Sequence, residues 1–442
     1  MRLYFITAGA AGMYCGSCIR ENALAAELIR QGHQVLLIPL YTPIRTDERD
    51  VSERRVFFGG ISVYLEQHVP LLRRTPWLFD RLWDAPGVLR AFSKLAIRTS
   101  PNQLGALTVS MLRGQDGPHN KEFRKLLEWL QSQPKPDVVT LHNSMLIRLA
   151  DPIRKALGCP VCCTLQGEDL FLDRLAEPYR LEALRLIRQS TEAADVFVAV
   201  SEYYAGFMSR YLGIPERKMR VVPLGINLEA YPQEPRRVGQ PRPLAIGYFA
   251  RVAPEKGLDR LCEAYRILRF ERQLPPSRLE AAGYLGPEYR SYLRRIERQM
   301  RDWGLGDEFR YHGELDRAAK LRFLESLDVL SVPTVYPEPK GLYVLEAMAC
   351  GVPVVQPRHG AFPEIIEKTR GGMLVAPNDA ASLAEGIEAL WKDAATAGQL
   401  GRNGFAGVRA HYTAAHMAAQ ALEVYARLPR GSSHGAAASR RL

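Results

Sequence analysis

Two glutamates near the end of the chain are placed where their carboxylates could bind hydroxyl groups. Glu338 falls in a proline-flanked loop, and Glu346 falls in the helix that is predicted to follow this loop. Glu346 shares the apolar face of that helix with Leu342 and Leu345, so its carboxylate should be buried. Burying a carboxylate without a partner costs roughly several kcal/mol, so a protein donor or a hydroxyl-rich ligand must satisfy it. Spacing alone does not separate such a site from an ordinary loop glutamate and an ordinary helix glutamate.

The turn between these glutamates is suited to a phosphate group. Gly341 lets another molecule approach the backbone closely, and the amides from Lys340 to Leu342 have no partners within the helix. These amides and the helix dipole favour an anion. One carboxylate for sugar hydroxyls, one for ribose hydroxyls and a phosphate between them would together form a sugar-nucleotide site.

Two cations upstream could bind the same kind of ligand. Arg251 and Lys256 follow the strand predicted for LAIGYF and flank Pro254. Arginine can bind a phosphate through two parallel hydrogen bonds, and lysine can act as a mobile point charge. The pair is therefore expected to converge on a diphosphate.

Three ordered motifs in the second half of the chain resemble those of the retaining glycosyltransferases of family four. EPKGLYVLEAMACGVPVV is similar to the family's paired-glutamate motif, with Lys340 in place of a phenylalanine. GYFARVAPEKG resembles its diphosphate motif, with Ala250 in place of a glycine. HGAFPEIIEKTRGGMLVAPND resembles its Gly-Gly-x-x-Glu turn and the segment after it, with Ala361 in place of the second glycine.

This resemblance implies a two-domain GT-B enzyme that transfers a sugar from a nucleotide diphosphate with retention of anomeric configuration. The nucleotide sugar is then a substrate, and neither a metal nor a further cofactor is expected. The implied catalytic residues are Glu338, which orients the donor sugar, His142, which supports the reacting face, and Arg251 and Lys256, which stabilise the leaving diphosphate. The implied donor-binding residues are Glu346, Lys340, Gly341, Leu342, Gly360 and Glu364.

The first half of the chain matches the family more loosely. His142 ends the strand DVVTLH, where the family commonly has a histidine in the cleft; a histidine that only caps the strand is the alternative. One strand later the family often has Thr-x-His-Gly, whereas this chain has Gln166, which cannot act as an acid or a base. The residues expected to line the acceptor side are Gly16, Gln166, Glu168 and Asp169.

Cys15 and Cys18 form a C-x-x-C pair at the start of a predicted helix, where a thiol pKa can be lowered. A redox role therefore remains open. A zinc site would need two further ligands, and small apolar packing is the plain alternative.

The pattern of elements predicts an α/β fold with two domains. At 442 residues the chain is too long for one ordinary core. Apolar strands alternate with helices in both halves, which predicts doubly wound parallel sheets, and the family has two such Rossmann-like domains facing across a cleft. The expected division is 1–235 for the acceptor-side domain, 236–412 for the nucleotide-sugar domain, 413–428 for a helix crossing back to the first domain, and 429–442 for a disordered tail.

A formal net charge of +11 predicts anionic partners. Nucleic acid is not expected, because the chain has no zinc-finger spacing, aromatic RNA-binding signature or long Lys/Arg run. Residues 70–100 interleave arginines with aromatic residues, which suits either a helix on an anionic membrane surface or two helices packed into the first domain. The sequence has no signal peptide and no run of eighteen apolar residues, so a cytoplasmic protein, peripheral at the inner face of the membrane, is expected.

Two other functions remain open at the level of sequence. A protein that binds a sugar nucleotide without transferring the sugar would keep the same motifs, as would a GT-B epimerase acting on its own nucleotide sugar. The donor base, the sugar, the acceptor and the oligomeric state cannot be inferred from these residues.

Overall fold

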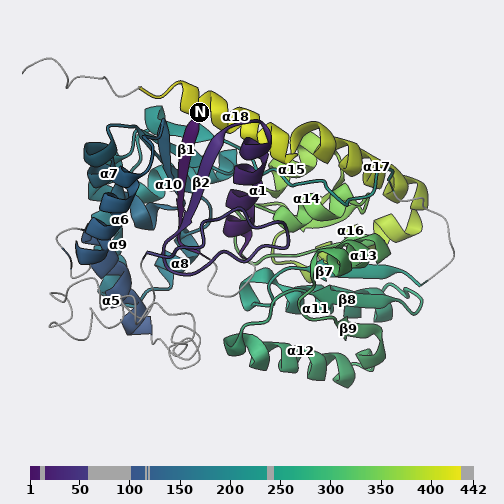
Figure 1. The fold of residues 1–442 in the computed structure, drawn as a ribbon. Helices are drawn as coiled ribbons and strands as arrows, with labels where there is room; N and C mark the ends of the chain where they lie inside the picture. The colour runs from purple at the N-terminus through teal and green to yellow at the C-terminus, as the bar shows by residue number, and fades with distance from the viewer. Residues whose placement is uncertain (10–14, 58–100, 115–116, 118–119, 236–242, 430–442) are drawn as a thin grey trace, which may run out of the picture. The chain divides into compact units, whose positions relative to one another are not determined.

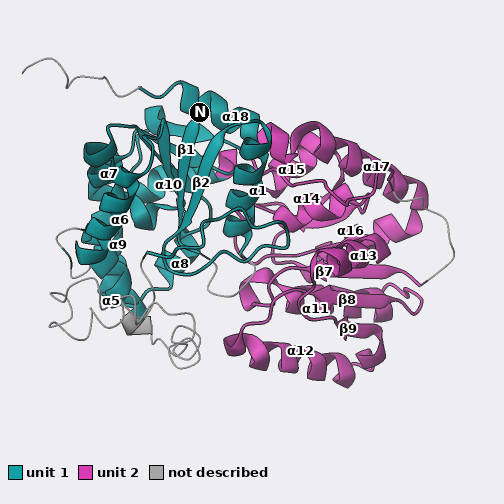
Figure 2. Ribbon diagram, viewed as in Figure 1, with its two compact units in different colours: residues 1–200, 204–222, 418–442 teal, residues 201–203, 223–417 magenta. Residues whose placement is uncertain are grey.

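A computed structural model describes residues 1–9, 15–57, 101–114, 117, 120–235 and 243–429. The chain divides into two compact units (Figure 2): residues 1–200, 204–222 and 418–442 form the first, and residues 201–203 and 223–417 form the second. The second unit thus begins at Pro223, upstream of the linker that the sequence predicts around residue 235. Both the aromatic and basic segment 70–100 and the predicted tail from 430 onwards lie outside the described residues.

The first unit is built on a parallel sheet of apolar strands (Figure 1). Its strands are β1 (Arg2–Thr7), β2 (Gln34–Pro39), β3 (Val138–Leu141), β4 (Val161–Leu165), β5 (Val196–Ala199) and β6 (Met219–Val221). Within the described residues the sheet has six strands, in the order β2-β1-β3-β4-β5-β6. The central strands are buried along their whole length, as expected where helices cover both faces of a parallel sheet. The strand order reverses between β1 and β3, so ligands are expected beyond the carboxyl ends of these strands.

Helices connect these strands. They are α1 (Gly16–Arg30), α5 (Pro101–Leu112), α6 (Asn120–Ser132), η4 (Ser144–Leu149), α7 (Ala150–Leu157), α8 (Asp169–Asp173), α9 (Tyr179–Gln189), η5 (Thr191–Ala193), α10 (Glu202–Leu212) and η6 (Glu216–Lys218). Among the described residues, no helix of the protein is long and apolar enough to span a bilayer.

The second unit repeats this plan. Its strands are β7 (Ala245–Phe249), β8 (Arg278–Ala282), β9 (Phe309–Tyr311), β10 (Val329–Leu330), β11 (Val354–Pro357) and β12 (Gly372–Val375). In the part of this unit that the structure describes, six parallel strands follow the order β12-β11-β10-β7-β8-β9. The order reverses between β7 and β10, so the loops after these two strands border the expected ligand crevice.

The helices of the second unit pack around this sheet. They are η7 (Pro254–Lys256), α11 (Leu258–Phe270), η8 (Pro287–Tyr289), α12 (Arg290–Asp302), η9 (Gly306–Glu308), α13 (Arg317–Ser326), α14 (Leu342–Ala349), α15 (Phe362–Thr369), α16 (Ala380–Lys392), α17 (Ala394–His411) and α18 (Ala414–Ala426). α11 packs against α16, and α14 packs against α17. From Ala418 onwards, α18 groups with the first unit.

Candidate functional site

The loops after β7 and β10 bring a lysine and a glutamate into direct contact. Lys256, at the end of η7, donates a hydrogen bond to the Glu338 carboxylate. Its ammonium also donates to the Tyr336 hydroxyl at 2.9 Å. Tyr336 and Tyr343 in turn donate to Glu338 Oε2 at 2.9 and 3.2 Å. Residues 82 positions apart in the sequence therefore form one partly buried cluster at the switch point of the second sheet, with Glu338 and Tyr343 as its buried members.

Glu338 is ionised in this cluster. Its side chain is almost completely buried, and burial by itself raises the pKa of a carboxyl group. The charge and the hydrogen bond of Lys256, the charge of Lys340 and the Tyr336 hydroxyl outweigh that effect and hold the pKa of Glu338 at about 2. Lys340 also donates its backbone N–H to Glu338 Oε1 at 3.3 Å. Glu338 is thus a fixed acceptor of hydrogen bonds and does not act as an acid at neutral pH.

Arg251 lies one turn before Lys256 and is more exposed. Its guanidinium donates to Glu255 Oε1 at 2.6 Å, and its backbone carbonyl accepts a hydrogen bond from Tyr248 at 2.9 Å. Over a third of the Arg251 side-chain surface is exposed, so the guanidinium is within reach of solvent and of a ligand. The predicted pair of cations therefore occupies one loop, with Lys256 partly buried and Arg251 at its rim.

The second glutamate of the motif is held by a residue that the sequence did not single out. Lys320 on α13 donates to Glu346 Oε1 at 2.6 Å, and both side chains are more than nine-tenths buried. Lys320 lies 26 residues upstream of Glu346, outside the three motifs that resemble the family. No motif in the sequence around Lys320 marks it as a partner of Glu346. The contact between the two residues follows only from the packing of α13 against α14.

Two glycines shape the turns around Glu338. Gly341 has φ +73° and precedes the first residue of α14, Leu342, with no side chain capping the helix. Gly360 has φ +59°, and a Cβ there would collide with the backbone of Glu338. Ala361 donates its N–H to the Glu338 carbonyl at 2.8 Å. The positive φ favours glycine at both positions, and at Gly360 the close approach of the Glu338 backbone leaves no room for a side chain.

Glu364 binds backbone in the structure. Its two carboxylate oxygens accept hydrogen bonds from the amides of Glu202 and Tyr203, at 2.9 and 2.6 Å. Burial raises the pKa of Glu364, although these two hydrogen bonds oppose the shift. Glu364, which the sequence predicts to bind the donor, therefore accepts hydrogen bonds from two backbone amides at the start of α10, as a helix-capping residue does.

Side chains at the ends of β10 and β11 also carry buried polar atoms without hydrogen-bond partners within the described residues. They are Ser331 Oγ and Thr334 Oγ1 in the loop after β10, Gln356 Nε2 on β11, and His359 Nδ1 in the loop after β11. The other end of Gln356 accepts from the Val332 N–H at 3.3 Å, and His359 Nε2 lies 2.9 Å from the Thr334 carbonyl oxygen. These groups are available to bind a polar ligand or water at the carboxyl edge of the second sheet.

In the first unit, the ends of β1, β3 and β4 meet in a second polar cluster. His142 is buried directly after β3, with Nδ1 3.2 Å from the Thr7 hydroxyl. Gln166 Nε2 donates to the His142 carbonyl at 2.9 Å and to Glu21 Oε1 at 3.0 Å. Glu21 is completely buried on α1 and also accepts a hydrogen bond from Arg20 at 2.7 Å. The sequence missed this buried ion pair, because adjacent charged residues in a helix usually mark its solvent face.

The Gln166 side chain has a defined orientation. Its amide nitrogen faces two oxygens, the Glu21 carboxylate and the His142 carbonyl, so the reverse orientation would place oxygen against oxygen. Its Oε1 is buried and has no hydrogen-bond partner within the described residues. Gln166 therefore offers an acceptor for one hydroxyl group.

The two carboxylates that follow Gln166 have structural partners. Glu168 accepts from the Gln166 N–H at 2.8 Å and from the backbone and hydroxyl of Ser144 at 3.1 and 3.0 Å. Asp169 accepts from the Tyr204 hydroxyl at 2.7 Å, and burial raises the pKa of this carboxyl group. Glu168 thus holds the loop in place, and Asp169 lies nearer the surface.

The C-x-x-C pair lies at the start of α1. Gly16 is the first residue of this helix, and Cys18 is completely buried in its first turn. A hydrogen bond with the Cys15 thiol and burial both raise the pKa of Cys18. Because the thiolate is the reactive form, this environment disfavours Cys18 as a redox nucleophile.

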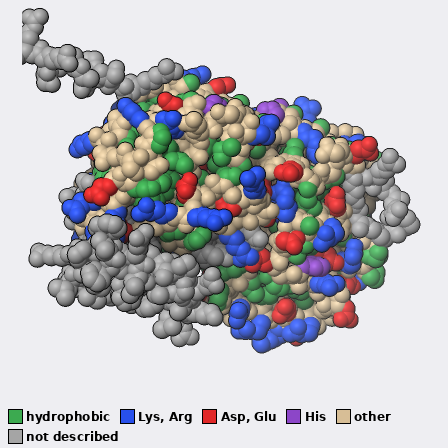
Figure 3. All heavy atoms as spheres, viewed as in Figure 1, with side chains coloured by type: hydrophobic (Ala, Val, Ile, Leu, Met, Phe, Trp, Pro, Cys, Tyr) green, Lys and Arg blue, Asp and Glu red, His purple; other side chains and the backbone are tan. Residues whose placement is uncertain are grey.

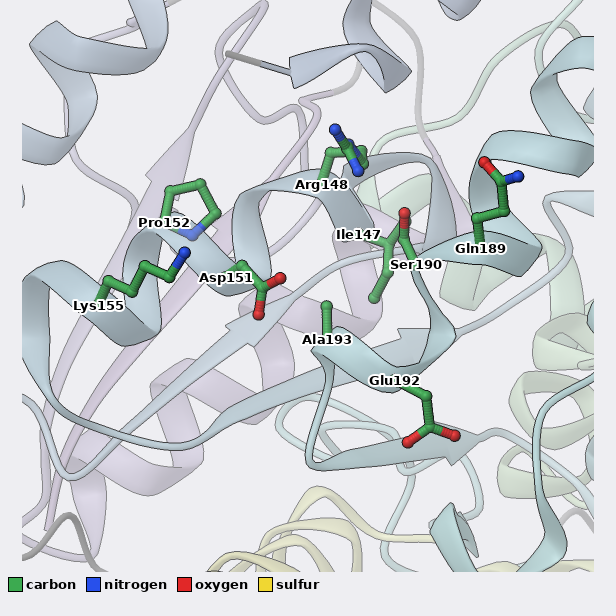
Figure 4. Close-up of a pocket in the computed structure, with 9 residues that line it drawn as sticks. All are labelled: Ile147, Arg148, Asp151, Pro152, Lys155, Gln189, Ser190, Glu192 and Ala193. Atoms are coloured by element: carbon green, nitrogen blue, oxygen red, sulfur yellow. The ribbon is translucent and has the colours of Figure 1, made fainter. Parts of the chain in front are cut away.

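A hollow of about 470 Å³ opens elsewhere in the first unit (Figure 4). It lies between η4 and α7 on one side and the end of α9 and η5 on the other. Its charged lining combines Arg148 and Lys155 with Asp151 and Glu192, and none of the predicted site residues contributes to it. Charges of both signs favour no single class of ionic ligand.

Comparisons with known proteins match the chain to glycosyltransferases. A family model for glycosyl transferases group 1 matches residues 233–406, and one for glycosyltransferase family 4 matches residues 108–230. WcaL of Escherichia coli strain K12, a glycosyltransferase named for colanic acid biosynthesis, is 29% identical over 72% of this chain and 77% of its own. The D-inositol 3-phosphate glycosyltransferase 2 of Catenulispora acidiphila is 27% identical over 69% of this chain and 73% of its own.

Solved structures share the fold at low sequence identity. Sucrose-phosphate synthase from Thermosynechococcus elongatus gives a TM-score of 0.68 at 19% identity, covering 96% of this chain and 98% of that chain. Anabaena HepE in complex with UDP gives a TM-score of 0.65 at 18% identity, covering 97% of this chain and 100% of that chain. These likenesses confirm the predicted two-domain α/β architecture with Rossmann-like parallel sheets. Because the two family models match residues 108–230 and 233–406, the chain belongs to the group 1 glycosyltransferases of family four, which have the GT-B fold.

Proposed function

We propose that the protein is a retaining hexosyltransferase that transfers a sugar from a nucleoside diphosphate sugar to a hydroxyl acceptor without a metal ion. The observation that carries this proposal is the hydrogen-bonded cluster of Lys256, Glu338, Tyr336 and Tyr343 at the switch point of the second sheet, in which Glu338 is buried. A carboxylate that is ionised at neutral pH can bind sugar hydroxyls while the lysine beside it binds an anionic leaving group.

Lys256 retains capacity for a phosphate. An ammonium group has three N–H donors, and within the described residues two of them bind Tyr336 and Glu338. The third can bind an oxygen of the leaving diphosphate, while Arg251 at the rim can reach the other phosphate. Two cations on one loop thereby neutralise the charge that develops as the glycosidic bond breaks, a role that a metal ion serves in other enzymes.

The proposed reaction balances without a protein base. The bond between the anomeric carbon and the diphosphate oxygen breaks, and its electron pair leaves with the diphosphate. The acceptor hydroxyl attacks the same face of that carbon, and its proton passes to an oxygen of the leaving phosphate. Glu338, with a pKa of about 2, orients the sugar through hydrogen bonds and takes no part in proton transfer.

The other residues receive supporting roles. Glu346, held by Lys320, is proposed to bind the ribose, and the amides around Gly341 to bind phosphate. In the first unit, His142 is proposed to support the reacting sugar, and Gln166 to accept a hydrogen bond from an acceptor hydroxyl. Gly16 and Asp169 border the same edge of the first sheet.

The relatives indicate which substrates to test. HepE was solved with UDP and UDP-glucose, and the catalytic domain of starch synthase IV from Arabidopsis thaliana with ADP and acarbose. We therefore propose UDP-, ADP- and GDP-hexoses as the donor panel, with sugar, lipid-linked and small-molecule hydroxyl acceptors. A cytoplasmic enzyme at the inner membrane face is consistent with cysteines that form no disulfide bond within the described residues.

The test is donor binding and nucleotide diphosphate release with purified protein. Wild type is compared with Lys256→Met and Glu338→Gln, and with the exposed control Glu385→Gln on α16. Binding of one donor by wild type and control, with at least a tenfold loss in both site variants, supports the proposal. Donor binding that is equal in all four proteins would refute it, and binding without turnover over the whole acceptor panel would favour a non-catalytic sugar-nucleotide-binding protein.

A further inference from the structure

Arg20 and Glu21 form an ion pair inside the first unit. On the face shown in Figure 3, side chains of both charges are interspersed over the surface, where water solvates them. Arg20 and Glu21 are instead 2% and 1% exposed, and Arg20 donates to Glu21 Oε1 at 2.7 Å. A buried ion pair adds little net stability compared with apolar side chains of similar size. No step of the proposed reaction uses this pair, so its burial requires a separate explanation.

The pair determines which way the Gln166 amide points. Arg20 can only donate hydrogen bonds, so the Glu21 oxygen that it contacts acts as an acceptor. Gln166 places its amide nitrogen 3.0 Å from this same oxygen. The opposite orientation would bring two oxygens together at Glu21, and again at the His142 carbonyl, which lies 2.9 Å from the nitrogen. Gln166 therefore directs an N–H group, and not its carbonyl, towards His142.

The Gln166 nitrogen in turn determines where His142 carries its ring proton. His142 Nδ1 lies 3.3 Å from this nitrogen and 3.2 Å from the Thr7 hydroxyl. An amide nitrogen has two N–H donors and no acceptor, whereas a hydroxyl can serve as either. A proton on Nδ1, in the other tautomer or in the doubly protonated ring, would therefore oppose the Gln166 donor. The favourable arrangement leaves Nδ1 as an acceptor and places the proton of the neutral ring on Nε2.

We propose that Glu21, held by Arg20, is a positioning residue that keeps His142 in the Nε2-protonated tautomer through the Gln166 amide. Nε2 is then a hydrogen-bond donor, and the lone pair of Nδ1 faces Gln166 and Thr7. His142 can donate to an oxygen of the sugar, but neither ring nitrogen is placed to take the proton of the acceptor hydroxyl. This consequence rests on the proposed function, in which that proton passes to the leaving phosphate, whereas the tautomer depends only on contacts within the first unit.

The test is nuclear magnetic resonance of the full chain with ¹⁵N-labelled histidine rings, at about pH 8. Long-range ¹H–¹⁵N correlations distinguish a protonated from an unprotonated ring nitrogen, and the signals of His142 are those missing from His142→Asn. The exchange variant combines Glu21→Gln with Gln166→Glu, which preserves the net charge and an acceptor oxygen at the second position but presents a carboxylate to Nδ1. The conservative control is Glu21→Gln alone, which retains an acceptor oxygen beside Gln166. Circular dichroism shows which variants are folded.

Wild type and the control should carry the proton on Nε2, and the exchange variant should carry it on Nδ1. With the acceptor panel, nucleotide diphosphate release should be at least tenfold slower in the exchange variant, while donor affinity stays within about threefold of wild type. The control should retain most of the wild-type rate. A loss of donor affinity equal to the loss of rate would indicate general damage to the fold and would overturn the positioning role.

A wild-type protein with the proton on Nδ1 would overturn the proposal even if no variant folds. A folded exchange variant that keeps the wild-type tautomer would overturn it as well, as would an unchanged rate in an exchange variant whose tautomer has moved. The tautomer is read without turnover, so failure of the proposed function is distinguishable. The expected tautomers in both proteins, without nucleotide diphosphate release from any donor, would support the positioning of His142 and refute sugar transfer.

Discussion

Replacing Lys256 with methionine should reverse the effect of Glu338 on the pH dependence of stability. In the native protein the pKa of Glu338 is held at about 2, below the ordinary value of 4.5. A depressed carboxyl pKa contributes stability that is fully present above pH 4.5 and is lost as the pH falls towards 2. The shift corresponds to about 3 kcal/mol at neutral pH.

In Lys256→Met the same carboxylate is buried beside two tyrosine hydroxyls without its principal cation. Burial then raises the pKa of Glu338 above 4.5, so at neutral pH the variant should lose about 3 to 5 kcal/mol. Because a raised pKa contributes stability that is lost as the pH rises, this variant should gain stability relative to wild type between pH 7 and pH 5. Adding Glu338→Gln to Lys256→Met should recover most of the loss, because no charge is then buried unpaired.

The measurement is urea unfolding at pH 7 and pH 5 for wild type, both single variants and the double variant. Differences between the unfolding free energies of the four proteins cancel the titration of every other group. They give the coupling energy between Lys256 and Glu338, which is expected at about 2 to 4 kcal/mol. A coupling energy below about 0.5 kcal/mol, or parallel pH slopes for wild type and Lys256→Met, would refute the assignment of Glu338 as a carboxylate kept ionised by Lys256.

Three further predictions follow from other contacts. Lys320→Met should weaken nucleotide diphosphate binding at least tenfold in calorimetry, because Glu346 loses its buried partner; unchanged affinity would exclude Lys320 as a positioning residue for the ribose. Prolonged treatment with EDTA should leave sugar transfer within about twofold of the untreated rate, and activity lost with EDTA and restored by a divalent cation would contradict metal independence. At pH 7.5 iodoacetamide should label Cys18 in urea but not in the folded protein, because its thiol pKa is raised; rapid labelling of folded protein, read by mass spectrometry, would reopen a redox role.

Local patterns were sufficient for most of the architecture. Apolar runs bounded by glycine, proline and polar residues predict the strands, and helical periodicity predicts the elements between them. The three motifs locate the loop that carries Arg251 and Lys256 and the turn around Gly341, because glycine at positive φ and proline in a first helical turn reflect what the backbone itself requires. The boundary between the units was harder to predict. The proline-rich linker was recognised by its composition, whereas the extent of each compact unit depends on contacts between residues far apart in the sequence.

Sequence-based prediction is weakest where one side chain depends on another that is distant in the chain. The types and spacing of Glu338, Glu346, Arg251 and Lys256, together with the family resemblance, led to the prediction of a sugar-nucleotide site in the second domain. Only the tertiary structure decided that Lys256 fixes the charge of Glu338 and that Lys320 holds Glu346. The physical reason is that pKa values and hydrogen-bond partners depend on burial and on distances of a few ångströms between segments that sequence order leaves apart.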